Sequence, residues 1–329
     1  ALTFFLRCVL GGLHLALERS TIRGKVVRAF DWDQTACQVY SANRGADVVQ
    51  KVDISTLGAA ELARYAADLW LLSPSCQPYT VLNPLAKGAA DPRARSFLHL
   101  VENVLPPLVA SGAHPHYLLI ENVAGFETSS TRQVLLQTLK GLGYATLELL
   151  LTPLQLGIPN SRLRYYLLAK MAPLTFKFPA DGEPERDRVW RHIPGRGADW
   201  DQRHQHAIPD KVLEKWGRLF DIVVPSARRT CCFTRGYTQL VERAGSVLQE
   251  NEALDAAEIP GAVTLLHPLR LRYFSPKELL RLFYFESCKD GGEGVFQWPE
   301  RVSRKSQYRL IGNSVNVRVV RELIDFLFE

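Results

Sequence analysis

Short apolar runs alternate with amphipathic segments along the first half of the chain, and this alternation predicts an α/β architecture. The clearest helical period follows residue 95, where Phe97, Val101, Val104, Leu105 and Leu108 fall three or four residues apart. The predicted strands are residues 2–6, 26–30, 68–72, 117–120, 144–151 and 165–169. The predicted helices are residues 11–19, 34–43, about 97–108, 130–142, 276–283 and 315–327.

The pattern changes after Met171. Residues 172–265 are rich in Pro, Gly, Arg and Trp and contain few long periodic segments, and helical periodicity returns only at Pro276. We therefore predict a larger α/β domain at residues 1–171 and a smaller second domain at residues 172–270. Residues 271–329 are expected to return to the larger domain.

Three predicted strands lead into polar or reactive side chains. Asp31 ends one strand, the segment SPSCQP at 73–78 follows another, and Glu121 with Asn122 ends a third. In an open α/β sheet the carboxyl ends of the strands form the edge at which ligands bind. We therefore expect a functional site to be built from these three segments.

The charge of the chain favours an anionic partner. The formal net charge is +6 and the pI is about 9.0, with basic side chains concentrated at 186–206 and 301–309. A run of charges is also typical of a solvated surface, so neither run alone identifies a partner. Because the chain has neither an apolar run of membrane-spanning length nor the features of a signal peptide, we expect a soluble intracellular protein without membrane contact.

The six cysteines show neither the spacing of a disulfide framework nor a CxxC pair, so we expect reduced thiols and no metal site. Cys76 differs from the others because prolines on both sides restrict its loop. A thiolate in such a loop is a directed nucleophile, and a carboxyl group on a neighbouring strand end, such as Glu121, is suited to hydrogen-bond a reacting ring. A lone cysteine is, however, more often a small buried apolar residue.

The segments around these residues resemble a known family. Four motifs, SPSCQPYT at 73–80, ENV at 121–123, NSRLR at 160–164 and GNSVNV at 312–317, have the order and spacing of the cytosine-5 methyltransferase motifs. Further segments resemble the transfer-RNA branch of that family, the tRNA-aspartate methyltransferases, and the resemblance extends over essentially the whole chain. These segments are DPR at 91–93 with SFL at 96–98, GIPNSR at 157–162, CFTRGY at 232–237 and RYFSPKE at 272–278.

The resemblance implies a fold and a reaction. The fold would be a Rossmann-like, S-adenosylmethionine-dependent methyltransferase sheet with helices on both faces, and the smaller domain would recognise the target. The reaction would be methylation of carbon-5 of cytosine in the anticodon loop of tRNA, with tRNA-Asp as the expected species, through a covalent adduct of Cys76. The protein would act as a monomer in the cytoplasm, with the nucleus as an additional location.

The resemblance also implies roles for individual residues. The catalytic residues would be Cys76 as the nucleophile, Glu121 as the acid, Arg162 and Arg164 as side chains that orient the base and its loop, and Gln77. The residues that bind S-adenosylmethionine would be Gly11, Gly12, Leu13, Asp31 at the ribose, Asp53 and Ile54 at the adenine, Pro74, Asn313, Ser314 and Val315. The residues that bind the substrate would be Cys232, Phe233, Thr234, Arg235, Tyr237, Arg301, Arg304 and Lys305.

Several positions depart from the family pattern and leave alternatives open. Val9 stands where the first glycine of a glycine-rich turn is expected, and Ser75 replaces the proline before the nucleophile. The segment TVLN at 80–83 lacks an expected Arg and Gly, and Tyr284 and Glu286 replace Gly and Pro. One alternative is a methyltransferase-fold RNA-binding protein with impaired catalysis. Another is an enzyme that methylates DNA, against which the CFTRGY segment and the short recognition region argue.

Overall fold

The computed structural model describes residues 2–7, 10–79, 89, 91–177, 205–251, 266–286 and 296–329. Val9, residues 80–83 and most of the basic run at 186–206 lie outside the described residues. Every helix within the described ranges is too short or too polar to cross a lipid bilayer.

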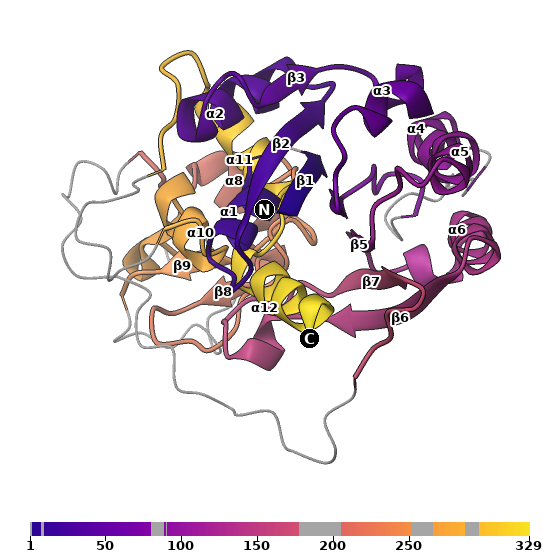
Figure 1. Cartoon of the computed structure of the whole chain (residues 1–329). Helices are drawn as coiled ribbons and strands as arrows, with labels where there is room; N and C mark the ends of the chain where they lie inside the picture. Colours follow the sequence, from indigo (N-terminus) through magenta and orange to yellow (C-terminus); the bar gives the residue numbers. More distant parts are fainter. Residues whose placement is uncertain are drawn as a thin grey trace.

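A seven-stranded sheet forms the centre of the molecule (Figure 1), with the strand order β3-β2-β1-β4-β5-β7-β6. All neighbouring strands run parallel except β7, which is antiparallel to both β5 and β6. The order reverses between β1 and β4, and such a reversal leaves a crevice outside the carboxyl ends of the strands. The strands are β1 (Leu2–Arg7), β2 (Gly24–Asp31), β3 (Val49–Lys51), β4 (Leu69–Leu72), β5 (Tyr117–Val123), β6 (Tyr144–Leu151) and β7 (Arg164–Met171).

Helices cover both faces of this sheet, because its central strands are apolar on both sides. In β4, Leu69 and Leu71 join the core beneath α1, α2 and α12, whereas Trp70 and Leu72 join the core beneath α3 to α6. The predicted α/β sheet with helices on both faces is therefore confirmed. The helices named here are α1 (Gly12–Glu18), α2 (Gln34–Arg44), α3 (Ala59–Ala63), α4 (Arg95–His99), α5 (Leu105–Ala110), α6 (Ser130–Gly141) and α12 (Val317–Phe328).

The single helix predicted near residues 97–108 is interrupted in the structure. α4 passes into a π-helical turn at Leu100–Val104 before α5 begins. α5 carries Pro106 and Pro107 in its first turn, and neither residue has a backbone N–H to donate to the preceding turn. The apolar face still runs through all three pieces, since Phe97, Val101 and Leu108 are buried.

A smaller sheet of order β10-β9-β8 is built from β8 (Ile222–Val223), β9 (Val247–Gln249) and β10 (Leu271–Tyr273). Its strands are short, and in Figure 1 they lie on the side of the molecule away from α4 to α6. Val223 and Leu248 belong to the same core as α1 and α12, so the small sheet packs on one face of the large one. The domain limits at 171 and 270 stay predictions, and the small sheet uses residues on both sides of position 270.

The C-terminal part returns to the large sheet through three helices. α10 (Pro276–Leu282) begins with a capping box in which Ser275 and Glu278 bond each other's backbone N–H groups. α11 (Arg304–Gly312) begins after its N-cap Ser303, and no apolar period in the sequence predicted it. α12 packs against α1, and its apolar residues Val319, Val320 and Leu323 are buried as their spacing predicted.

Candidate active site

The carboxyl edge of the large sheet opens into a cavity of about 730 Å³. Its walls come from the ends of β2 and β5, the loop after β4, the segment that enters β7 and the end of α11. The predicted site residues that line it are Asp31, Asp53, Ile54, Pro74, Cys76, Gln77, Glu121, Arg162, Arg164, Arg235 and Asn313.

The loop that carries Cys76 is fixed on the side that follows the cysteine. The Cys76 carbonyl accepts a hydrogen bond from the Tyr79 N–H at 3.0 Å, and the buried Tyr79 hydroxyl donates to Thr131 Oγ1 at 3.1 Å. Arg93 donates to Gln77 Oε1 at 2.6 Å and binds Asp91 through two hydrogen bonds of 2.8 and 2.6 Å. Gln77 is therefore placed as a support of the loop beside the half-buried Cys76.

Glu121 is a buried carboxylate at the end of β5, and it faces the same cavity as Cys76. Ser73 Oγ donates to its Oε2 at 2.6 Å, and Arg164 Nε lies 3.4 Å from its Oε1. These contacts follow from the sheet, because β4 and β7 are the two neighbours of β5. These contacts fix the Glu121 carboxyl group in the cavity that Cys76 also lines. The position suits a hydrogen bond between Glu121 and a ring bound in the cavity.

Arg162 joins three distant segments of the chain. Its guanidinium donates to the carbonyls of Phe233 at 3.0 Å, Gly312 at 3.0 Å and Ser314 at 2.6 Å. The guanidinium also stacks over the Phe283 ring at 5.1 Å from its centroid. Arg162 was predicted to orient the base and its loop, and in the structure its donors mainly hold the walls of the cavity together.

Cys232 lies beside both arginines. Its Sγ is 3.5 Å from Arg162 Nη1 and 3.7 Å from Arg164 Nη2. Burial alone would raise the pKa of the Cys232 thiol, but the two guanidinium groups outweigh it and lower that pKa. Cys232 is absent from the lining of the cavity, so within the described residues it acts on the site through Arg162 and Arg164.

The second half of the cavity lies between the end of β2 and α11. The buried Asp31 accepts the Asp33 N–H at 3.0 Å, and Asp33 caps α2 while it forms an ion pair with Arg309 of α11. Asp53 accepts hydrogen bonds from the Ser55 N–H at 2.9 Å and from Ser96 Oγ at 3.0 Å, which lower its pKa. The Asp53 side chain thus caps the turn that follows it and also lines the cavity.

Five of the predicted cofactor residues pack inside the protein instead of lining this cavity: Gly11, Gly12, Leu13, Ser314 and Val315. Gly11 is the N-cap of α1 and lies in the left-handed region with φ of 76°, and a Cβ there would lie 3.3 Å from the Tyr40 ring. A Cβ on Gly12 would lie 3.0 Å from both Phe285 and Val315, and Leu13 is buried in the same core. These residues set how closely α1 approaches the C-terminal part. Ser314 is buried too, with its hydroxyl bonded to the Ile311 carbonyl at 2.7 Å.

Some of the predicted substrate residues are buried in the protein, whereas Arg235 lines the cavity. The rings of Phe233 and Tyr237 are enclosed in the core, so the prediction that they contact a substrate does not fit their placement. The Tyr237 hydroxyl donates to the Ser246 carbonyl at 2.7 Å and accepts the Phe274 N–H at 2.9 Å. Thr234 packs closely on Gly312, whereas Arg235 is exposed and lines the cavity.

The three predicted basic residues lie outside the cavity wall. Arg304 donates to the Gln205 carbonyl at 2.9 Å and to its Oε1 at 2.6 Å, which ties α11 to the end of the first basic run. Lys305 is exposed, and Arg301 lines a separate hollow against α2. Arg309, the fourth basic residue of this run, is the one that lines the cavity.

Trp32, Ser73 and Arg309 contribute to the cavity although none of them was predicted as a site residue. Trp32 is 70 % exposed and lines the wall directly after Asp31, where its flat ring is available to an aromatic ligand. Ser73 bonds Glu121, and Arg309 fixes Asp33. The position of Trp32 after a polar strand end was a usable signal; the pairings of Ser73 and Arg309 were not visible in the sequence.

Comparison with known proteins agrees with this geometry. The family described as C-5 cytosine-specific DNA methylase matches residues 3–329. The tRNA (cytosine(38)-C(5))-methyltransferase of Schizosaccharomyces pombe is 38% identical over 97% of this chain and 94% of its own length. The human protein of the same name is 34% identical over 97% of each chain.

Solved structures show the same likeness in three dimensions. The crystal structure of the Schizosaccharomyces pombe Dnmt2 methyltransferase superimposes with a TM-score of 0.81 at 36% identity, covering 99% of this chain and 97% of that one. The predicted resemblance is thereby confirmed at the level of the family and of the enzyme class. The chain belongs to the C-5 cytosine-specific methylase family.

Proposed function

We propose that this protein methylates carbon-5 of a cytosine in the anticodon loop of a tRNA, with tRNA-Asp as the substrate. The observation that carries the proposal is that Cys76 and Glu121 open into one cavity, where Ser73 and Arg164 hold the carboxylate. The substrate class rests on the relatives, which are tRNA (cytosine(38)-C(5))-methyltransferases. A single-stranded loop suits this site, since a base leaves such a loop at a smaller cost than it leaves a duplex.

The cavity also fits the methyl donor that enzymes of this family use. S-adenosylmethionine supplies the methyl group when it is bound. The buried carboxylate Asp31 lines the cavity and would hold the ribose, and Ile54 and the exposed ring of Trp32 would offer surfaces to the purine. Asn313 closes the opposite wall at the end of α11. The volume of about 730 Å³ accommodates this donor together with one base.

The chain's own residues then perform the following steps. Cys76 Sγ forms a bond to carbon-6 of the cytosine while Glu121 shares a proton with ring nitrogen 3, so that carbon-5 becomes nucleophilic. After carbon-5 has taken up the methyl group, water from the solvent accepts the carbon-5 proton, the double bond between carbon-5 and carbon-6 re-forms, and Cys76 leaves carbon-6 as a thiolate. Ring nitrogen 3 returns its proton to Glu121. Arg162 keeps the walls in register during these steps, and Arg164 balances the charge of Glu121.

The covalent step is tested with RNA that carries 5-fluorocytosine at the target, because fluorine cannot leave as a proton does. We expect a stable protein–RNA adduct with the parent protein and with Cys231→Ala, which removes a half-buried thiol outside the cavity. Cys76→Ala should form no adduct and should still bind the RNA. An adduct that persists in Cys76→Ala would overturn the assignment of the nucleophile.

The substrate is tested by transfer of a labelled methyl group to tRNA and to duplex DNA, since the family is described as a DNA methylase. We expect transfer to tRNA alone. Transfer to DNA alone would support the DNA methyltransferase, and RNA binding without transfer to any RNA would support the impaired RNA-binding protein.

A further inference from the structure

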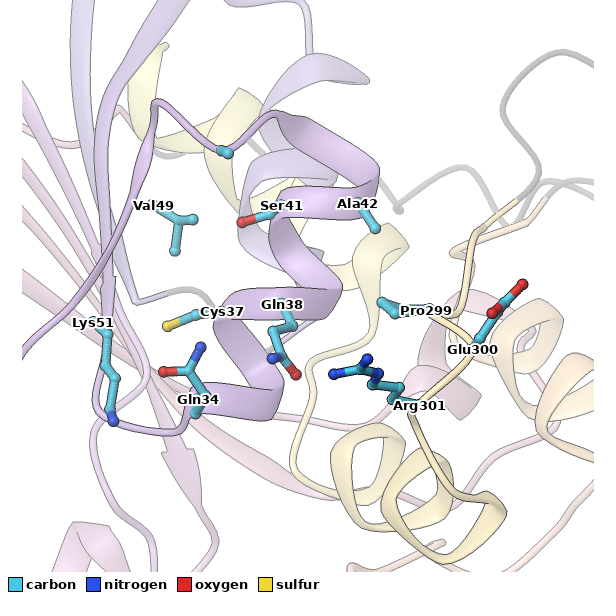
Figure 2. A pocket seen from close by; sticks show the side chains of 11 residues that line it. Gln34, Cys37, Gln38, Ser41, Ala42, Val49, Lys51, Pro299, Glu300 and Arg301 are labelled. Atoms are coloured by element: carbon cyan, nitrogen blue, oxygen red, sulfur yellow. The ribbon is translucent and has the colours of Figure 1, made fainter.

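A second hollow, separate from the Cys76 cavity, lies over α2 (Figure 2). Its volume is about 660 Å³. In Figure 2 the helix forms its floor, the end of β3 forms one wall, and residues 299–301 form the other. The size is sufficient for one nucleotide, and the hollow is open to solvent.

The polar groups of the hollow favour an anion. Lys51 and Arg301 lie on its two opposite walls, and Gln34 and Gln38 lie between them on α2 (Figure 2). Within the described parts of the chain, neither Lys51 nor Arg301 has an acidic partner within ion-pair distance. Among the described residues of the lining, Glu300 is the only acid, and Figure 2 shows its carboxylate directed away from α2. The two cations are therefore available to bind phosphate from opposite sides.

The position of the hollow connects it to the Cys76 cavity. Lys51 is the register partner of Asp31 in the sheet, and Asp31 lines the Cys76 cavity. On the first turn of α2, Asp33 and Ala36 face that cavity, whereas Gln34 and Cys37 face the hollow. The wall that bears Arg301 continues into α11, and the far end of α11 returns to the cavity at Gly312. The exposed cations Arg304 and Lys305 lie at the start of α11, in the segment that joins Arg301 of the hollow to Gly312 of the cavity.

We propose that this hollow is a second RNA subsite, in which Lys51 and Arg301 hold one phosphate–ribose unit of the tRNA outside its anticodon loop. The proposal rests on the proposed function and extends it, since it assigns a contact to a part of the tRNA that does not enter the Cys76 cavity. The amide groups of Gln34 and Gln38 offer hydrogen bonds to ribose hydroxyls, and Pro299 and Ala42 offer apolar surface to a ring. The subsite therefore selects RNA by its backbone and its 2′-hydroxyl groups.

The test compares two double variants that remove the same charge. The hollow variant, Lys51→Ala with Arg301→Ala, removes both cations of the hollow. The control variant, Arg64→Ala with Lys140→Ala, removes two exposed cations on the other face of the sheet, one beside α3 and one at the end of α6. Binding of full-length tRNA and of an isolated anticodon stem-loop is measured across a range of salt concentrations. Methyl transfer is measured with saturating tRNA.

We expect the hollow variant to bind full-length tRNA about tenfold more weakly, with a salt slope reduced by about one, because the two cations hold one phosphate. Its affinity for the stem-loop and its methyl transfer at saturation should equal those of the parent. Equal losses in the hollow variant and the control would overturn the proposal, as would unchanged tRNA affinity. Calorimetric binding of inorganic phosphate that the hollow variant loses, with tRNA affinity unchanged, would assign the hollow to a small anion. A parent that binds no tRNA would instead refute the proposed function.

Discussion

Arg162 is predicted to hold the active site together as well as to serve it. Its guanidinium makes hydrogen bonds of 3.0, 3.0 and 2.6 Å to three carbonyls, and its side chain is 3% exposed. A hydrogen bond to a charged group contributes about 1.5–3 kcal/mol, so three contribute about 4.5–9 kcal/mol before the cost of burying the charge is subtracted. That cost is several kcal/mol, and we expect Arg162→Met to lower the free energy of unfolding by about 3–5 kcal/mol.

Urea denaturation followed by tryptophan fluorescence measures this loss. With a slope of about 3 kcal/mol per molar urea, the midpoint should fall by about 1 M or more. Arg318→Met is the matched control, because Arg318 pairs with Glu322 on the partly exposed surface of α12 and contributes at most about 1 kcal/mol. Arg162→Lys should lose part of the stability, since an ammonium group cannot reach all three carbonyls with a planar fork. An unchanged midpoint for Arg162→Met would show that these contacts do not hold the segments together.

Two further predictions concern the loop before Cys76 and the half-buried His14. Ser75→Pro should restrain the backbone before Cys76 and raise turnover about fivefold, equivalent to about 1 kcal/mol. The affinity for S-adenosylmethionine, measured by calorimetry, should stay unchanged, and equal single-turnover rates of the parent and the variant would contradict the prediction. Burial and the charge of Arg44 lower the pKa of His14 to about 4, so between pH 6.5 and 4 the unfolded chain binds a proton that the folded protein does not. Stability should fall by up to about 3 kcal/mol as the pH drops through this window, and His14→Gln, which keeps a partner for Tyr40, should remove that part of the pH dependence of the urea midpoint.

The family and the main sheet could be predicted because their signals are local. A strand such as β4 is a short apolar run, and the SPSCQP segment after it excludes regular structure through its two prolines. Asp31, Cys76 and Glu121 follow or end strands of one sheet, so their convergence follows from the strand order alone. The helix near residue 100 was only partly predictable, since its apolar period continued through the π-helical turn.

What the tertiary structure alone decided is the direction and the partner of each side chain. Gly12, Phe233 and Tyr237 belong to motifs that predicted contact with a ligand, yet they pack in the core. Arg162 bonds carbonyls that lie 71, 150 and 152 residues further along the chain. Periodicity and turn residues act over a few positions, whereas a buried donor takes whichever acceptor the folded chain brings within about 3 Å. That choice depends on the packing of every element around it.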